Sequence, residues 1–352
     1  MAVRGNPLVR GCAPCGPKGQ IGADVPRNAD RRAHRMAALQ GQLPRLREAT
    51  RGLRSLHTRG GLWPSHIRIR SEFFSGSPYR TPPIARISAP RGINLQVYLL
   101  GLFEAQTRKR DGMAGPCPLP ILGTRHEVSW STIVVSAATQ NMQAKIPVTA
   151  AQNRARQIKS AFKRLADENL AVRNIGDPAN PFPLMLLHES GSAHFEKYGY
   201  TVPEWYENTP STVSLHVDFF REGWVYLLTP AEIRMYLVLN HLAPRFPDMH
   251  AERGVYISEQ DRMWRYDLSR DIYEAHLTLS RFGLVEKVDD KTRHTDGKMI
   301  NYSERVARGE FASPHRFKVA PDKALREPAW ERIERALMNY PPTFEQMKRK
   351  RG

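Results

Sequence analysis

The chain has 352 residues, of which 41% are hydrophobic, and its formal net charge is +18. This length suits two ordinary domains with cores of their own. No apolar run approaches the ~20 residues that cross a bilayer, and the N-terminus lacks the features of a secretory signal. We therefore expect a cytoplasmic protein without a membrane partner.

The positive charge is concentrated at the N-terminal end. Residues 1–92 hold 17 Lys and Arg against 4 Asp and Glu, a net charge of +13, whereas residues 191–352 carry only +1. An excess of this size indicates a polyanionic partner, most commonly a nucleic acid backbone. We therefore expect an association with the nucleoid, although an Arg-rich tail can also be a solvated extension.

The three cysteines, Cys12, Cys15 and Cys117, are too few for a disulfide framework and favour a reducing compartment. Cys12 and Cys15 have C-x-x-C spacing, but no second pair or closely spaced histidines complete a zinc site. The sequence thus predicts no metal site, and no motif indicates a cofactor.

Residues 1–92 are rich in Gly, Pro and Arg and show little periodicity, so we expect a basic, mostly disordered arm. A helix is hinted at over 35–56, where Pro44 interrupts it.

A first unit is expected over 93–190. Apolar spacing predicts helices over 93–109, 129–142 and 150–168, the last with Thr149 as N-cap and Asn169 at the left-handed position after its end. Strands at 171–175 and 182–188 complete a hairpin.

An aromatic-rich linker is expected over 191–228. It holds nine aromatic residues between positions 194 and 226. Stacking on unpaired bases is one interpretation. We favour packing between the two domains, because aromatic side chains dominate core burial.

A second unit is expected over 229–320. Thr229 and Pro230 start a helix to 242, and a short strand (254–259), a short helix (258–266) and a helix capped by Ser269 and ended by Gly283 follow. Strands at 284–288 and 315–319 flank a charged loop. Residues 321–352 form a C-terminal helix and a basic tail.

The two units repeat one pattern. Five positions of the first unit recur 114 residues later with the same spacing: Ile158, Ala161, Leu165, Asn169 and Leu170 correspond to Ile272, Ala275, Leu279, Gly283 and Leu284. The order of helix, short helix, capped helix, strand, turn and strand resembles the winged-helix DNA-binding superfamily over about 93–320. The resemblance implies an α+β fold with two tandem winged-helix domains, each a helix-turn-helix followed by a β-hairpin wing.

The third helix of such a unit reads base edges in the major groove. In the first unit its polar face carries Asn153, Arg154, Arg156, Gln157, Lys159, Ser160, Lys163 and Arg164. Asn, Gln and Arg suit base edges and Lys suits phosphates. A solvated helix face is the alternative, but such faces usually mix both signs of charge.

The second unit has a mixed third helix with Arg270 and a basic wing with Lys291, Arg293 and Lys298. It suits DNA backbone contact or, equally, dimerisation or partner docking.

No catalytic motif is recognisable, so we expect a protein that is not an enzyme. The first hypothesis is a sequence-specific double-stranded DNA-binding protein, most simply a transcriptional regulator and possible homodimer. A similar architecture occurs in plasmid replication initiators, which bind repeats at an origin. The alternative of another class is a protein-interaction scaffold built on winged helices.

Overall fold

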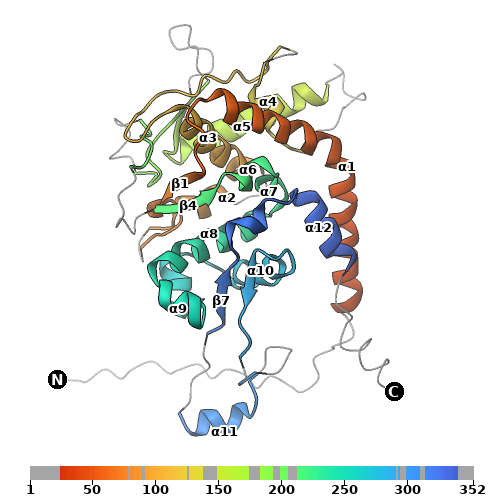
Figure 1. The fold of residues 1–352 in the computed structure, drawn as a ribbon, viewed down its shortest axis with the longest axis vertical. Coiled ribbons are helices and arrows are strands. Elements are labelled where there is room, and N and C mark those ends of the chain that lie inside the picture. The colour runs from red at the N-terminus through yellow and green to blue at the C-terminus, as the bar shows by residue number, and fades with distance from the viewer. Residues whose placement is uncertain are drawn as a thin grey trace, which may run out of the picture.

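The computed structural model describes residues 24–77, 80–88, 92–124, 127–137, 149–173, 183–192, 199–204, 212–290, 292–293, 299–309 and 314–339. These residues form a mixed α+β protein in which helices predominate and the strands make small antiparallel sheets (Figure 1). Cys12, Cys15, Lys291 and Lys298 lie outside the described residues.

The N-terminal region is built around one long helix. Its elements are α1 (Asp24–Arg59), β1 (His66–Arg70), η1 (Ser71–Phe73) and α2 (Pro83–Ser88). Helix α1 buries Leu46, Ala49 and Leu53, and it contacts α3, α4, α6 and α12. Our expectation of a mostly disordered arm over 1–92 is therefore wrong from residue 24 onwards.

The error has a physical cause. Pro44 lies inside α1, which bends over the body rather than ending (Figure 1). A proline removes one intrahelical hydrogen bond and kinks a helix that other contacts hold in place. Most helical stability in proteins comes from tertiary packing. The sparse apolar residues of α1 therefore do not indicate a helix by themselves, because the elements that α1 packs against lie far away in the sequence.

The first unit follows the expected order. It comprises α3 (Asn94–Arg108), α4 (Trp130–Ile133), α5 (Ala150–Asp167), β2 (Ala171–Arg173) and β3 (Leu184–Leu186). Strands β2 and β3 pair antiparallel, and the backbone of Cys117 forms an isolated antiparallel β-bridge with Leu184 of β3. Helix α4 is shorter than the helix expected over 129–142, and residues 138–148 of the connection to α5 lie outside the described residues.

The expected elements of the second unit occur in the expected order, and the structure adds short helices over 247–252 and 302–307 that the sequence did not predict. Its elements are α8 (Pro230–Arg245), α9 (Pro247–Glu252), β5 (Val255–Tyr256), the π-helix η3 (Asp261–Arg265), α10 (Arg270–Arg281), β6 (Val285–Lys287), α11 (Tyr302–Ala307) and β7 (Arg316–Val319). The strands form one antiparallel sheet in the order β5-β7-β6. Helix α11 lies in the loop between β6 and β7 and projects from the body (Figure 1).

Both third helices end as the sequence predicts. Asn169 after α5 and Gly283 after α10 have positive φ values of 55° and 70°. In each case the N–H of the next residue donates to the carbonyl five positions earlier, that of Leu165 at 2.9 Å and that of Leu279 at 3.0 Å. This is the Schellman closure, which satisfies backbone groups that the helix end leaves free.

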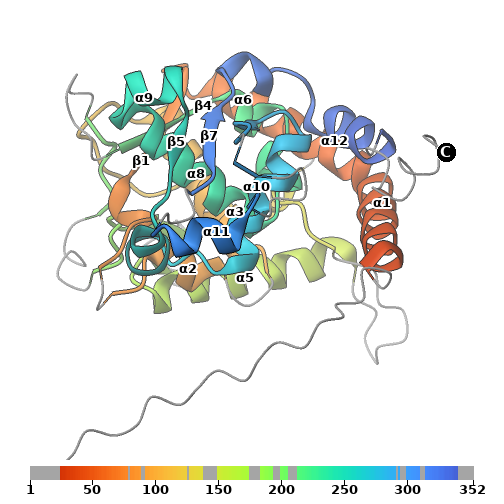
Figure 2. The ribbon, with the colours of Figure 1, turned by 90° about the horizontal axis from the view of Figure 1, so that it is seen from below.

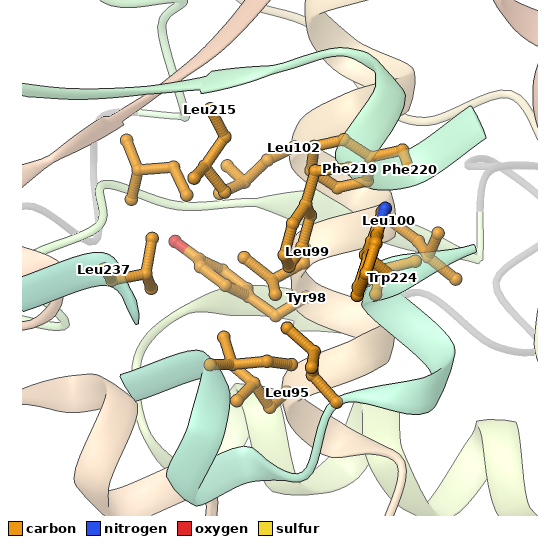
Figure 3. Packing of buried hydrophobic residues seen from close by; sticks show 14 of the residues in the cluster. Leu95, Tyr98, Leu99, Leu100, Leu102, Leu215, Phe219, Phe220, Trp224 and Leu237 are labelled. Atoms are coloured by element: carbon orange, nitrogen blue, oxygen red, sulfur yellow. The ribbon is translucent and has the colours of Figure 1, made fainter. Parts of the chain in front are cut away.

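The segment between the units is part of the core. It contains β4 (Thr212–His216), α6 (Asp218–Arg221) and α7 (Trp224–Leu227), and β4 pairs antiparallel with β1. Phe219, Phe220 and Trp224 are fully buried against α3 (Figure 3). The packing interpretation is thus confirmed for these aromatic residues, and the two units share one hydrophobic cluster instead of forming separate cores.

The C-terminal helix α12 (Ala329–Met338) closes the structure, preceded by η4 (Asp322–Leu325). It buries Ala329, Trp330 and Ile333 and contacts α1 and α7. Seen from below, α12 and α1 lie together on one side of the molecule, and α9 and β5 lie on the other (Figure 2). The long N-terminal helix and the C-terminal helix therefore brace both units.

A buried histidine predicts an acid-sensitive core. His241 on α8 packs on Phe74, with ring centroids 5.1 Å apart, and burial together with Arg245 and Arg265 lowers the pKa of His241 to about 4. An unfolded histidine titrates near ~6.5, so the unfolded chain gains a proton first. The contribution of neutral His241 is complete above about pH 6.5 and is lost as the pH falls towards 4.

We expect this residue to remove about 3 kcal/mol of unfolding free energy over that pH range. Urea denaturation at a series of pH values measures it. His241→Phe keeps the packing and removes the titration, so its stability curve should be flatter between these pH values. An identical pH dependence in both proteins would contradict the assignment.

Candidate nucleic-acid interface

Helix α5 has one buried and one exposed face. Ile158, Phe162 and Leu165 are fully buried, and Trp130 of α4 meets Phe162 edge-on with ring centroids 5.2 Å apart. The opposite face exposes the side chains of Arg156, Gln157, Lys159, Ser160 and Lys163. Burial of the apolar face therefore determines which polar residues point outward.

The start of α5 is well defined. Thr149 accepts a hydrogen bond from the N–H of Gln152 at 3.2 Å, and the Gln152 side chain accepts one from the N–H of Thr149 at 2.9 Å. This reciprocal capping box satisfies two backbone donors that a helix start leaves free. The first turns of α5 are thus ordered up to the exposed residues that follow.

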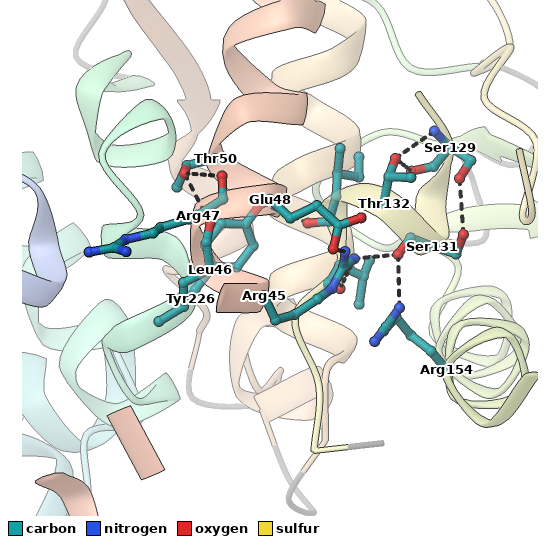
Figure 4. A network of polar contacts seen from close by, with 12 residues as sticks. Arg45, Leu46, Arg47, Glu48, Thr50, Ser129, Ser131, Thr132, Arg154 and Tyr226 are labelled. Atoms are coloured by element: carbon teal, nitrogen blue, oxygen red, sulfur yellow. Dashed lines mark hydrogen bonds and ion pairs between the residues drawn. The ribbon is translucent and has the colours of Figure 1, made fainter. Parts of the chain in front are cut away.

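Arg154 is the main departure from the sequence prediction. Its side chain is half-buried, and its Nη1 donates to the carbonyl of Ser131 on α4 at 3.4 Å. The guanidinium of Arg45 on α1 donates to the same carbonyl (Figure 4) and pairs with Glu48 at 2.6 Å. Burial, and then the like charge of Arg45, lower the pKa of Arg154. Arg154 therefore ties α5 to α4 beside α1 and is less exposed than Arg156.

Arg164 is also engaged internally. It donates to the backbone carbonyl of Arg86 at 3.0 Å and pairs with Glu168 at 2.8 Å. Glu168 in turn pairs with the side chain of Arg86 at 2.6 Å. Arg164 thus anchors the end of α5 to α2 while 39% of its side chain stays exposed, and a DNA contact there stays a prediction.

The exposed residues differ in their partners. Lys163 pairs with Asp167 at 2.8 Å, and both side chains are solvent-accessible. Within the described parts of the chain, no carboxylate pairs with Arg156 or Lys159. Asn153, nearest the start of the helix, is partly buried. The outward face of α5 therefore carries two uncompensated cations beside Gln157.

The second unit presents less uncompensated positive charge than α5. Arg270 is exposed at the start of α10 but pairs with Glu274 at 2.8 Å, and Arg293 pairs with Asp290 at 3.3 Å. His276 is buried, and burial lowers its pKa. The exposed face of α10 therefore has no excess positive charge in its first two turns.

The sequence analysis missed a group of arginines at the other end of α10. Two adjoining hollows of about 340 and 250 Å³ share Arg281 and are lined by residues of α1, α10 and α12. Their guanidinium groups belong to Arg31, Arg32, Arg35, Arg281, Arg332 and Arg335. The charges were visible in the sequence, but only packing of α1 against α12 gathers them.

Part of this group has a structural role. Nε of Arg332 donates to the carbonyl of Phe282 at 2.9 Å, and the Arg35 guanidinium lies 4.8 Å from the Phe282 ring centroid. Cations stabilise the negative end of a helix dipole. Arg35 also pairs with Glu232 at 2.7 Å. These arginines thus hold the end of α10 in place.

Comparisons with known proteins add no relative, because no protein-family model, curated protein or solved structure matches this chain. In the described ranges, no cluster of three or more His, Cys, Asp or Glu residues is arranged to hold a metal ion. The helices described in those ranges include none that is both long and apolar enough to cross a membrane.

Proposed function

We propose that the chain is a sequence-specific double-stranded DNA-binding protein, most simply a transcriptional regulator, that reads the major groove with α5. The observation that carries this proposal is the outward face of α5. It presents Arg156, Gln157 and Lys159 to solvent while the apolar face is fully buried. The overall charge of +18 provides the attraction for a polyanion.

The architecture supports the same proposal. In our interpretation both units are winged helices, in which α3, α4 and α5 precede the β2–β3 hairpin and α8, η3 and α10 precede the β6–β7 hairpin. The matching Schellman closures of α5 and α10 agree with a repeated unit. In such units the third helix enters the major groove.

Roles on α5 follow from chemistry and orientation. Arg156 is suited to bidentate contact with guanine and Gln157 to adenine, since their side chains are exposed and carry the required donors and acceptors. Lys159 and Lys163 are point charges that suit phosphate contacts, which add affinity without sequence information. Arg154 and Arg164 act indirectly by fixing the orientation of the helix.

A replication initiator is the second candidate. The observation in its favour is the hydrophobic cluster that the two units share, which holds them side by side. Such a pair suits an extended site or a set of origin repeats. The mixed charges of α10 favour instead the third candidate, a scaffold whose units bind proteins.

Selection from a random DNA pool with the full chain, in the presence of heparin, tests the proposal. We expect one enriched motif, bound at least about 10³-fold more tightly than unrelated DNA. Several tandem copies of the motif in a natural footprint indicate an initiator, and one operator beside a promoter indicates a regulator. An absence of any enriched motif would refute sequence-specific binding and favour the scaffold.

A further inference from the structure

The two adjoining hollows between α1, α10 and α12, of about 340 and 250 Å³, have a lining rich in arginine. We call them together the arginine hollow. Figure 1 shows α12 between α10 and the first half of α1, so segments far apart in the sequence meet there. Six of the eleven lining residues are arginines, which are Arg31, Arg32, Arg35, Arg281, Arg332 and Arg335.

No Asp or Glu of the described residues lines the arginine hollow. The carboxylates that pair with its arginines lie outside the lining. Glu232 pairs with Arg35 at 2.7 Å. Glu327 pairs with both Arg332 and Arg335. A guanidinium has five N–H donors and no acceptor, so the side chains that line the hollow supply positive charge and hydrogen-bond donors without an acid among them.

The remaining lining residues add little apolar surface. Thr278 contributes a hydroxyl and Asn339 an amide, and both groups can donate a hydrogen bond. Phe282 is only 2% exposed, which leaves Ala336 and Leu337 as the accessible apolar side chains. A ligand of the arginine hollow is therefore held by charge and hydrogen bonds, which suits an anion with several oxygen atoms.

Capping of α10 does not account for all six arginines. The Schellman closure already satisfies the carbonyls of Leu279 and Ser280 with backbone N–H groups. Nε of Arg332 donates to the carbonyl of Phe282 at 2.9 Å. One guanidinium thus completes the end of the helix, and the gathering of the other arginines around it has a different cause.

The arrangement brings like charges together. Arg31 and Arg35 are one turn apart on α1, and like charges at this spacing destabilise a helix. Arg31 is exposed, and no carboxylate of the described residues pairs with it. A multiply charged anion in the arginine hollow offsets this repulsion. Because such an anion binds the folded chain, it also stabilises the fold.

The neighbouring parts of the sequence are a poor source of that anion. Residues 1–23 precede α1, and residues 340–352 follow Asn339 after α12. Together they contain seven Lys and Arg and a single acid, Glu345. The charge that complements six arginines is therefore expected from a separate molecule.

We propose that the arginine hollow binds a small anion with two or more linked phosphate groups, the chemistry shared by pyrophosphate and the phosphate chain of a nucleotide. Two hollows that share Arg281 suit two linked phosphates, and guanidinium groups match phosphate oxygens in pairs. The site does not rest on the proposed function, since α5 lies near the top in Figure 1 and the hollow lies lower, beside α10 and α12.

Isothermal titration calorimetry of the full chain with inorganic pyrophosphate at about 0.15 M NaCl tests the site. We expect saturable binding of one pyrophosphate per chain, at least roughly 10-fold tighter than binding of orthophosphate. Arg31→Gln/Arg281→Gln should weaken pyrophosphate binding at least roughly 10-fold, the loss that one charge-assisted hydrogen bond represents. Arg51→Gln/Arg253→Gln removes the same charge at exposed positions outside the hollow, and it should keep the affinity.

Thermal unfolding checks that each variant is folded, and pyrophosphate should raise the unfolding temperature of the unmodified chain more than that of the hollow variant. Arg335→Gln is a second hollow variant, since that side chain is 56% exposed, and it should also weaken binding. Absence of saturable binding, equal affinity for orthophosphate and pyrophosphate, or equal losses in the hollow and control variants would overturn the proposal.

A titration with unrelated duplex DNA separates a small anion from a nucleic acid backbone. The hollow and control variants should bind the duplex equally if the hollow takes a small anion. A duplex affinity that falls selectively in Arg31→Gln/Arg281→Gln would assign the hollow to a nucleic acid and overturn the proposal. Selection of a DNA motif by a hollow variant tests α5 separately, so the two proposals fail independently.

Discussion

The double variant Arg156→Ala/Gln157→Ala is expected to keep its affinity for DNA in general and to lose its preference for the selected motif. Both side chains are exposed on α5, and a good bidentate contact with a base contributes about 1–3 kcal/mol of discrimination, or roughly 5- to 150-fold. Competition binding between the motif and scrambled DNA measures the ratio. An unchanged ratio would remove α5 as the reading helix.

Two further variants separate reading from positioning. Lys159→Ala should weaken binding to all sequences alike and reduce the slope of log affinity against log salt by about 1. Arg154→Ala should instead lower the free energy of unfolding, because the Arg154 guanidinium contacts the Ser131 carbonyl beside Arg45. A selective loss of discrimination in Arg154→Ala, without loss of stability, would contradict this assignment.

Arg70→Ala is expected to destabilise the fold by about 3–5 kcal/mol, the typical cost of leaving one member of a buried ion pair alone. Glu189, which follows the β2–β3 hairpin, is fully buried and pairs with the Arg70 guanidinium on β1. The N–H of Arg70 donates to the same carboxylate at 3.3 Å, and the guanidinium donates to Thr201 at 3.1 Å. This network joins the first unit to the β1–β4 sheet.

The pH dependence of Arg70→Ala has a definite sign. Burial raises the pKa of Glu189, and Arg70 opposes that rise, so removal of Arg70 should raise the pKa further. The folded carboxyl then holds its proton to a higher pH than the unfolded one, and stability falls as the pH rises from about 4.3 through the folded pKa. The deficit should therefore be larger near pH ~8 than near pH ~5.

Urea denaturation of Arg70→Ala, Glu189→Gln and Arg70→Met/Glu189→Met measures this effect. The double variant should recover much of the lost stability, because it leaves no buried charge unpaired. Equal losses in Arg70→Ala at both pH values would show that the packing of the side chain, and not the unpaired carboxylate, is responsible.

The sequence alone determined where the main helices of both units begin and where both third helices end. Thr149, Thr229 and Ser269 cap the helices they were expected to cap, and the left-handed residues Asn169 and Gly283 end α5 and α10. These signals are readable because caps and closures depend on neighbours within about five positions along the chain. The 3.6-residue period of the apolar face of α5 likewise predicted which of its residues are exposed on the opposite face.

Tertiary structure alone decided what depends on distant partners. Helix α1 is stabilised by contacts with α3, α4, α6 and α12, and β1 pairs with β4 far along the chain. Whether an arginine of α5 points to solvent or to a neighbouring helix was likewise settled by the carbonyl groups within its reach: Ser131 holds Arg154, whereas Arg156 meets solvent. A helical period specifies a face, but the surrounding elements specify how much of that face they cover.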